Sequence, residues 1–203
     1  MKLYYSRGAC SMVTRIVLNE LGVTYTAEAV DLRTKTSENS TDFREINPKG
    51  SVPVIVLDNG AILTEGQVIL QYLCDTYQGQ ALLPEVGNFS RYRVLEWLNY
   101  ISTELHKGFA PLFNPALPED IKKQFFIPAL EARFAFVNQH LTENAYMAGA
   151  HYSIADAYLF VMLSWCSHCG IKLTGLEALL RLQKTLAARA AIIKALKDEG
   201  FGA

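Results

Sequence analysis

The sequence has 203 residues, of which 50% are hydrophobic and 11% aromatic, and this is enough apolar material for a buried core. Nineteen Lys and Arg residues against 20 Asp and Glu residues give a formal net charge of −1. No basic field is therefore available to attract phosphate backbones or an anionic membrane surface. These numbers describe a globular protein and argue against nucleic acid and membrane as partners.

We expect no secretory signal, because Arg15 and Asn19 interrupt the only apolar candidate near the N-terminus. The longest apolar run, residues 157–166, is roughly half of the length that a membrane-spanning helix needs. Cysteines are too sparse for a disulfide scaffold, so we expect free thiols and a cytoplasmic location. They are Cys10, Cys74, Cys166 and Cys169.

The first part of the chain alternates strands and helices. Strand-rich apolar runs lie at residues 2–5, 23–32, 54–57 and 61–63, the last two around a turn at 58–60. Helical spacing of apolar residues is found over 11–22, ended by Gly22, and from Gly66 onward. A polar stretch from Arg33 to Thr41 and a short helix ending at 47–50 fill the middle. The order predicts a βαβ unit, a polar connection and a ββα unit.

The second part of the chain predicts helices only. Apolar residues recur every three or four positions over residues 89–109, 119–141, 153–170 and 176–200, with no strand-like alternation. We place a domain boundary near residues 78–87. The predicted domains are 1–80 and 87–203.

Cys10 stands where the first strand turns into the first helix. A cysteine at a helix N-terminus faces unpaired backbone N–H groups and the positive end of the helix dipole, which favour the thiolate. The alternative is an inert, buried cysteine, the commonest fate of this residue type. The position favours a reactive thiol.

Pro53 and Glu65 are the central residues of the next two candidate motifs. Proline lacks a ladder donor, so Pro53 belongs at the start of a strand, and where such a proline is cis the preceding residue can pair with an extended peptide. Glu65 and Gly66 lie between a strand and a helix, where free N–H groups bind a carboxylate and Glu65 can hold an ammonium. The alternatives are an ordinary strand-start proline and a carboxylate that only stabilises the helix start.

Two further motifs are assigned structural roles. Cys166 and Cys169 form a Cys-x-x-Cys pair with His168 between them, but they fall in the last turn of an apolar helix, where the dipole disfavours a thiolate. Two thiols and one imidazole also fall short of a structural zinc site. Ser153 and Asp156 match a capping box at a helix start, with Asp in place of Glu.

Taken in order, five stretches carry a family resemblance. They are YYSRGACS, NPKGSVPV, LTEG, RYRVLEWLNYISTELHKGF and YSIADAYLF. In this order and at this spacing they resemble the glutathione transferases, and among these the bacterial beta class. The likeness covers nearly the whole chain. It implies an α/β thioredoxin-like N-terminal domain with a mixed four-stranded sheet, followed by an all-α C-terminal domain that forms the electrophile site.

The resemblance also implies a glutathione site on the N-terminal domain. Cys10 would lie beside the glutathione sulfur or be disulfide-linked to it, and Lys35 would reach the glycyl carboxylate. The main chain of Val52 would pair with the cysteinyl moiety, while Glu65 and Gly66 hold the γ-glutamyl zwitterion. The implied residues are Cys10, Lys35, Val52, Pro53, Glu65 and Gly66.

In the helical domain, Asn99, Thr103 and His106 recur at i, i+4 and i+7, which places them on one face of an α-helix. The resemblance implies that this face closes the site from the same or the neighbouring subunit. The implied residues are Asn99, Thr103, Glu104, Leu105 and His106. His106 is a candidate catalytic residue, with Lys107 adding positive potential that suits a thiolate; the alternative is a surface or internally satisfied histidine.

The expected function is conjugation of the glutathione thiol to small hydrophobic electrophiles, as in detoxification, by a cytoplasmic homodimer. Glutathione is then a co-substrate, and no metal is expected. Cys10 opens a second enzymatic possibility, thiol–disulfide exchange through a mixed disulfide with glutathione. A third possibility is a non-catalytic interaction module that keeps the fold, which the presence of all the implied site residues disfavours.

Overall fold

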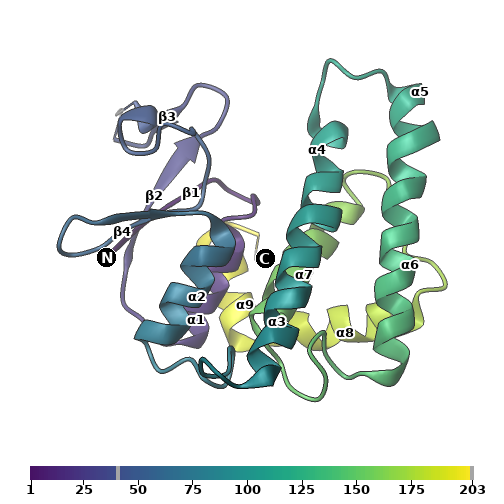
Figure 1. Cartoon of the computed structure of the whole chain (residues 1–203). Helices are drawn as coiled ribbons and strands as arrows, with labels where there is room; N and C mark the ends of the chain where they lie inside the picture. Colours follow the sequence, from purple (N-terminus) through teal and green to yellow (C-terminus); the bar gives the residue numbers. More distant parts are fainter. Residues whose placement is uncertain (40–41, 202–203) are drawn as a thin grey trace. The chain divides into compact units, whose positions relative to one another are not determined.

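The structure, a computed structural model, describes residues 1–39 and 42–201 and contains two compact units (Figure 1). The first unit comprises Met1–Leu83 and the described residues from Arg189 onward, and the second comprises Pro84–Ala188. Ser40 and Thr41, which end the expected polar stretch, lie outside the described residues, as do Gly202 and Ala203. Each unit is described by itself.

The first unit is built on a mixed five-stranded sheet in the order β3-β2-β1-β4-β5. Strand β1 pairs parallel with β2 and antiparallel with β4, while β3 and β5 add antiparallel edges. The strands are β1 (Lys2–Tyr5), β2 (Thr26–Asp31), β3 (Thr36–Ser37), β4 (Val54–Val56) and β5 (Ile62–Thr64). The mixed sheet is confirmed, with one strand more than the four expected. Strand β3 has two residues and lies in the polar stretch, where no apolar alternation marks it.

Three helices belong to the first unit: α1 (Met12–Glu20), α2 (Gly66–Thr76) and α9 (Ala190–Asp198). Helix α1 packs between α2 and α9, and the side chains from Met12 to Leu18 are all buried (Figure 1). The apolar spacing read from the sequence thus marks a helix covered on more than one side. Helix α9 comes from the far end of the chain, whereas the sequence grouped residues up to 203 with the helical domain; the limits 1–80 and 87–203 stay a prediction.

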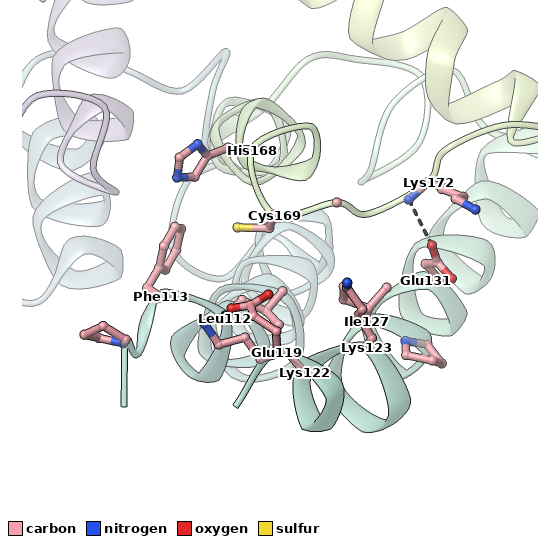
Figure 2. Close-up of a pocket in the computed structure, with 13 residues that line it drawn as sticks. Leu112, Phe113, Glu119, Lys122, Lys123, Ile127, Glu131, His168, Cys169 and Lys172 are labelled. Atoms are coloured by element: carbon pink, nitrogen blue, oxygen red, sulfur yellow. Dashed lines mark hydrogen bonds and ion pairs between the residues drawn. The ribbon is translucent and has the colours of Figure 1, made fainter. Parts of the chain in front are cut away.

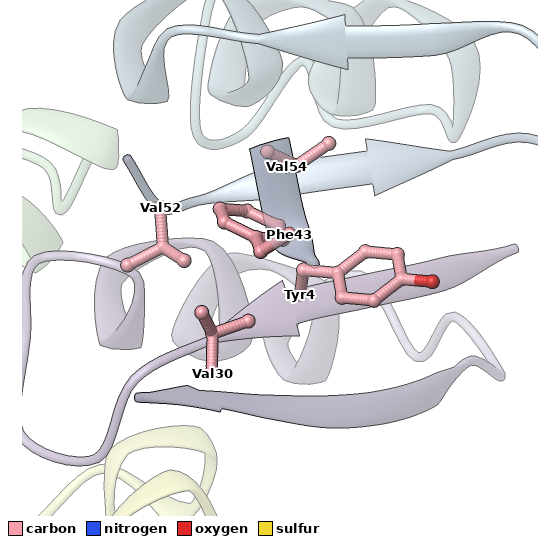
Figure 3. Packing of buried hydrophobic residues seen from close by; sticks show 5 residues of the cluster. All are labelled: Tyr4, Val30, Phe43, Val52 and Val54. Atoms are coloured by element: carbon pink, nitrogen blue, oxygen red, sulfur yellow. The ribbon is translucent and has the colours of Figure 1, made fainter. Parts of the chain in front are cut away.

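A small apolar cluster lies against the sheet and fixes the loop before β4. Figure 3 shows Phe43, from a short 3-10 helix η1 (Phe43–Glu45), among side chains of the strands. Its ring centroid lies 5.7 Å from that of Tyr4. The buried members are Tyr4, Val30, Phe43, Val52 and Val54. Because Val52 belongs to this cluster, apolar burial holds its backbone at the start of β4.

The second unit is helical, as expected, but two of its long helices include π-helical turns. Helix α3 (Phe89–Tyr100) continues through η2 (Ile101–His106), a π-helical segment, into α4 (Lys107–Phe113). Helix α5 (Glu119–Ile121) continues through a second one, η3 (Lys122–Phe126), into α6 (Ile127–Glu143). Single π turns inside α-helices often occur at functional sites.

Helix α7 (Ile154–Cys166) lies in the core of the second unit, with every residue from Ile154 to Leu163 buried. Its predicted capping box is present: the Asp156 carboxylate accepts from the Ser153 N–H at 2.9 Å and the Ser153 hydroxyl at 2.8 Å. The Met147 N–H also donates to Asp156, at 2.8 Å. The cap therefore also ties the preceding loop to the helix start.

Helix α8 (Glu177–Ala187) completes the second unit. The sequence treated residues 176–200 as one helical stretch, but the chain breaks at Ala188 and Arg189, so that α8 and α9 belong to different units. Within residues 1–39 and 42–201, no helix has both the length and the apolar character that a membrane span requires.

Candidate functional site

The turn between β1 and α1 presents Cys10 next to the backbone of Val52. The Cys10 thiol donates to the Val52 carbonyl oxygen at 3.3 Å. Ser11 braces the turn, because its hydroxyl accepts from the Ser6 N–H at 3.1 Å and donates to the Ser6 carbonyl at 3.2 Å. The predicted position of Cys10 at a strand-to-helix turn is confirmed.

The protonation state of Cys10 differs from the expectation. Burial raises the pKa of the Cys10 thiol to about 11, and the N–H groups of Cys10 and Ser11 lower it by less. Desolvation of the charged form thus outweighs the helix start, and the neighbouring atom is a carbonyl oxygen, which accepts from a thiol and repels a thiolate. With a pKa of about 11, the Cys10 thiol is neutral at pH 7.

The loop before β4 carries Val52 and Pro53, joined by a cis peptide bond. The Val52 side chain is buried in the cluster of Figure 3, and its carbonyl accepts from Cys10. Within residues 1–39 and 42–201, the Val52 N–H has no hydrogen-bond acceptor. A buried residue with an unpaired backbone donor is a place where an extended peptide can add its own acceptor.

Two lysines organise this loop, one from outside it and one that belongs to it. Lys35, in the left-handed conformation at φ 61°, donates through Nζ to the Gly50 carbonyl at 2.8 Å. Lys49 forms an ion pair with Glu65 and donates to the Thr64 hydroxyl at 2.7 Å. The sequence reasoning named Lys35 and missed Lys49. Only the pairing of β4 with β5 brings Lys49 to a carboxylate sixteen positions later, so no local signal marks it.

Glu65 precedes α2 with φ 69°, an unusual conformation for a residue with a side chain, and its carboxylate is largely exposed. Gly66 begins the helix, and a Cβ there would lie 3.7 Å from the Pro53 ring. The residues predicted on the first unit therefore meet around one loop, residues 47–53. Cys10, Lys35 and Glu65 each contact it, and Gly66 lies next to the Pro53 ring.

The residues predicted on the second unit lie at the end of α3 and in the π-helical segment η2. The sequence predicted that Asn99, Thr103 and His106 share one face of an α-helix. This prediction is wrong, because residues 101–106 are π-helical and the α-helical spacing does not apply there. The Thr103 hydroxyl donates to the Asn99 carbonyl at 3.2 Å. Glu104 turns to α6, where Arg133 pairs with it at 2.9 Å, and Leu105 is fully buried.

His106 turns instead to α7. Its Nδ1 lies 2.5 Å from the Tyr158 hydroxyl, and its ring meets the Tyr158 and Trp165 rings edge-on, at centroid distances of 5.7 and 5.3 Å. Burial, with a smaller effect from Lys107, lowers the pKa of His106 to about 4. The imidazole is neutral at pH 7, so it offers a hydrogen bond but no positive charge.

Of the Cys-x-x-Cys pair, one cysteine lies in the core of the second unit and the other lines a cavity. Cys166 is buried, its thiol lies 3.6 Å from the Met162 carbonyl, and burial raises its pKa to about 12. Cys169 and His168 line a cavity of about 950 Å³ within the second unit (Figure 2), where His168 stacks on Phe113. No group of three or more metal-ligating side chains occurs in the part of the chain that the structure describes.

Comparison with known proteins identifies the family. The profile described as "Glutathione S-transferase, N-terminal domain" matches residues 8–76. Glutathione S-transferase GstA of Escherichia coli O157:H7 is 44% identical over 99% of this chain and 100% of its own length. The chain belongs to the glutathione S-transferase family. The expectation of an enzyme, a glutathione transferase, is confirmed.

Solved glutathione S-transferases also share the fold. A sphingomonad glutathione S-transferase complexed with glutathione is 38% identical, with a TM-score of 0.94 over 100% of both chains. The bacterial beta class glutathione S-transferase of Sphingomonas chungbukensis is 38% identical, with a TM-score of 0.94, over 99% of this chain and 100% of its own. These neighbours confirm the thioredoxin-like first part, the helical second part and the beta-class resemblance of this glutathione S-transferase.

Proposed function

We propose that this enzyme joins the thiol of glutathione to small hydrophobic electrophiles and so takes part in detoxification. The observation that carries the glutathione part is the unpaired N–H of Val52 beside the Cys10 thiol, within the described residues. A tripeptide that pairs with Val52 as an added strand receives backbone hydrogen bonds there, and its own cysteine sulfur comes next to Cys10.

The ends of glutathione would be held by charge. Glu65, with its exposed carboxylate, suits the γ-glutamyl ammonium, and the backbone N–H groups at the start of α2, from Gly66 on, suit the γ-glutamyl carboxylate. Lys35 suits the glycyl carboxylate. Because Lys49 already pairs with Glu65, the incoming ammonium has to share or displace that ion pair. Lys49 thus belongs to the proposed site.

The proposed site includes residues of the second unit. They are Asn99, Thr103, Glu104, Leu105 and His106. A Tyr158 hydroxyl that donates to Nδ1 of His106 leaves the proton on Nε2, where it can donate to a glutathione thiolate. A neutral imidazole stabilises a thiolate through that hydrogen bond rather than through charge, and the rate gain comes from holding the thiolate next to its acceptor.

Thiol–disulfide exchange through Cys10 is a second candidate, supported by the contact between the Cys10 thiol and Val52. The Cys10 sulfur, after losing its proton, would attack the glutathione sulfur of a mixed disulfide between glutathione and a substrate thiol, and the substrate would leave as its thiol. A second glutathione would then attack the Cys10–glutathione disulfide, restore the Cys10 thiol and leave as glutathione disulfide. The raised pKa of Cys10 makes the first step slow, because only the thiolate attacks.

The protein is further proposed to be a cytoplasmic homodimer. Large aromatic side chains are exposed on one face of the second unit, formed by α3 and α6. Phe136 is 56% exposed and packs beside Tyr100, with 5.4 Å between ring centroids. Phe89 and Tyr92 extend this face, at 67% and 53% exposure. Apolar side chains that exposed are typical of an interface.

Calorimetric titration of the reduced protein with reduced glutathione tests the proposed function. Wild-type protein is expected to bind in the micromolar to low millimolar range, roughly −4 to −8 kcal/mol. Glu65→Ala is expected to weaken binding about tenfold or more, because it removes the anion that meets the ammonium. Glu143→Ala, which removes an exposed carboxylate at the end of α6, is the matched control and should bind like wild type.

The outcomes separate the three possibilities. Binding that depends on Glu65, together with turnover of an aryl halide, supports conjugation. A mass increase of Cys10 by one glutathione after incubation with glutathione disulfide, reversed by reductant, supports exchange. No heat of binding to the folded wild-type protein would overturn both and leave the interaction module.

A further inference from the structure

A buried carboxylate near the C-terminal end of the chain contacts one residue before Cys10 and one residue after it. Glu199 follows α9, and its side chain has no exposed surface. One carboxylate oxygen accepts from the Gly8 N–H at 2.8 Å, and the other pairs with Nε of Arg15 at 3.1 Å. Gly8 is two residues before Cys10, and Arg15 lies in the second turn of α1. A single side chain therefore spans the turn that carries the thiol.

The next two residues hold the outside of the same turn. Arg7 donates to the Gly200 carbonyl at 2.7 Å, and its guanidinium lies 4.7 Å from the Phe201 ring centre. Gly8 has φ 69°, and a Cβ there would lie 3.0 Å from the Phe201 ring. A side chain at Gly8 would have to push the Phe201 ring aside, and the positive φ there favours glycine, so the turn and the tail fit together closely.

The tail is itself fixed. The N–H groups of Gly200 and Phe201 donate back to the Lys197 and Leu196 carbonyls, at 3.0 and 2.8 Å, and so close the end of α9. Helix α9 is joined to α1, where Asn19 donates to the Ala191 carbonyl at 3.2 Å. Contacts on an anchored tail restrain the turn, whereas contacts on a free tail would not.

A buried ion pair is weak support for stability, because desolvation cancels much of the attraction, and its best-attested use is to fix one arrangement. Arg15 is enclosed further by the Tyr5 ring, 4.2 Å from the guanidinium carbon, and by the Tyr25 hydroxyl at 3.4 Å from Nη1. The arrangement fixed here is the path of the chain from Ser6 to Arg15.

We infer that Glu199, Gly200 and Phe201, hereafter the C-terminal latch, position the turn that carries Cys10, with Glu199 as the positioning residue. The inference rests on the proposed function of Cys10. It concerns the position of the turn, however, and this position can be measured without glutathione. With the latch closed, the Cys10 thiol stays on the Val52 carbonyl. With the latch open, the turn moves and the thiol is released to solvent.

Alkylation of Cys10 by iodoacetamide, measured by peptide mass spectrometry, tests the C-terminal latch in the full-length protein. Glu199→Gln is expected to raise the Cys10 alkylation rate at least about fivefold and to speed hydrogen exchange in the peptide covering residues 6–11. Glu199→Asp, which keeps the charge, should recover part of the wild-type rate. Asp198→Asn, whose partner is Lys194 and not the turn, is the matched control and should stay within about twofold of wild type.

Glu199→Gln leaves Arg15 without its anion, so a second variant guards against loss of the fold. Phe201→Ala removes only the outer contact from a half-exposed ring and should raise both rates in the same direction by a smaller factor. Unchanged alkylation and exchange in both folded variants would overturn the inference.

Glutathione titration of the same variants separates this inference from the proposed function. A wild-type protein that binds no glutathione would sink the proposed function, while the alkylation and exchange rates would still report on the C-terminal latch. Weaker glutathione binding in Phe201→Ala, with an unchanged melting temperature, would support a positioning role over a purely stabilising one.

Discussion

At the scale of single residues, Cys10 shows how burial and hydrogen bonding compete. The start of α1 favours a thiolate, but removal of the thiol from water and the Val52 carbonyl at 3.3 Å favour the neutral form. The sequence revealed the first influence and could not reveal the second, because Val52 is 42 positions away. The direction of the pKa shift was decided by tertiary contacts.

A pH series of iodoacetamide labelling should show this resting state. The rate at Cys10 is expected to rise with a midpoint well above pH 9, because burial raises the pKa to about 11. At pH 7 this shift leaves about a hundredfold less thiolate than an unperturbed thiol would have. Cys10→Ala provides the background from Cys169, which is half-buried. A midpoint below pH 8 would contradict the raised pKa and would instead support the thiolate expected from the helix start.

Glu65 and Lys49 make the complementary point. The sequence identified Glu65 as a group that can hold an ammonium, and the structure places the Lys49 ammonium on it. A side-chain ammonium within the protein thus occupies the position proposed for the ligand's. Such a pair holds the Glu65 carboxylate in place. Separating it to admit a ligand ammonium would cost little, since exposed ion pairs contribute about 0–1 kcal/mol.

At the scale of elements, the start of α7 is the clearest case in which local sequence predicted local structure. The spacing of Ser153 and Asp156 predicted a capping box, and both residues have the contacts that such a box requires. Tertiary structure added the Met147 N–H as a third donor. The cap fixes where α7 begins, and α7 supplies Tyr158 and Trp165 to His106.

Urea denaturation should report these contacts. Ser153→Ala is expected to lower the free energy of unfolding by about 1 kcal/mol, as for other N-caps. Asp156→Ala should cost more, about 3 kcal/mol, because it leaves buried donors without an acceptor. Ser164→Ala, in the last turn of the same helix, is an exposed control expected within about 0.5 kcal/mol of wild type. Equal losses in Ser153→Ala and Ser164→Ala would contradict the role of the cap.

The π-helical segment η2 is one of the elements that the sequence could not predict. Apolar residues over 89–109 fit an α-helix well enough that periodicity gave no sign of extra residues in a turn. The π segment sends Glu104 to Arg133 on α6 and His106 to Tyr158 on α7. Packing between three helices, rather than local propensity, sets this geometry.

At the scale of the whole molecule, the order of the sequence does not decide to which unit a helix belongs. The first unit recruits α9 from the C-terminal end, with Ile192 and Ala195 fully buried and Arg189 paired to Glu20 at 2.7 Å. A reading in chain order assigns this helix to its sequence neighbours. Which unit covers an amphipathic helix depends on surfaces distant in the chain, and periodicity carries no such information.

Sedimentation velocity should test the proposed homodimer. Wild-type protein is expected to sediment at twice the chain mass of 22.6 kDa. A charge placed at the exposed aromatic face by Phe136→Asp is expected to shift it to the monomer, because an unpaired charge at an apolar interface is costly. Val86→Asp, at a side chain 78% exposed in the connection before α3, is the control. A wild-type protein that stays monomeric at about 50 μM would contradict the dimer, since such faces bury large areas when paired.

The sequence by itself determined the family, four of the five strands and their order with α1 and α2, the Cys10 turn, the proline before β4, the Glu65 helix start and the cap of α7. Each of these is written in neighbouring residues, as a hydrophobic period, a turn residue or a short motif, so local physics suffices to predict it.

Only the tertiary structure decided the protonation of Cys10 and His106, the pairing of Lys49 with Glu65, the fifth strand, the π turns and the contacts of Glu199 with Gly8. These depend on burial and on partners brought from distant positions, such as residue 199 beside residue 8. Desolvation and long-range pairing act on the folded chain as a whole, and for that reason no stretch of sequence contains them.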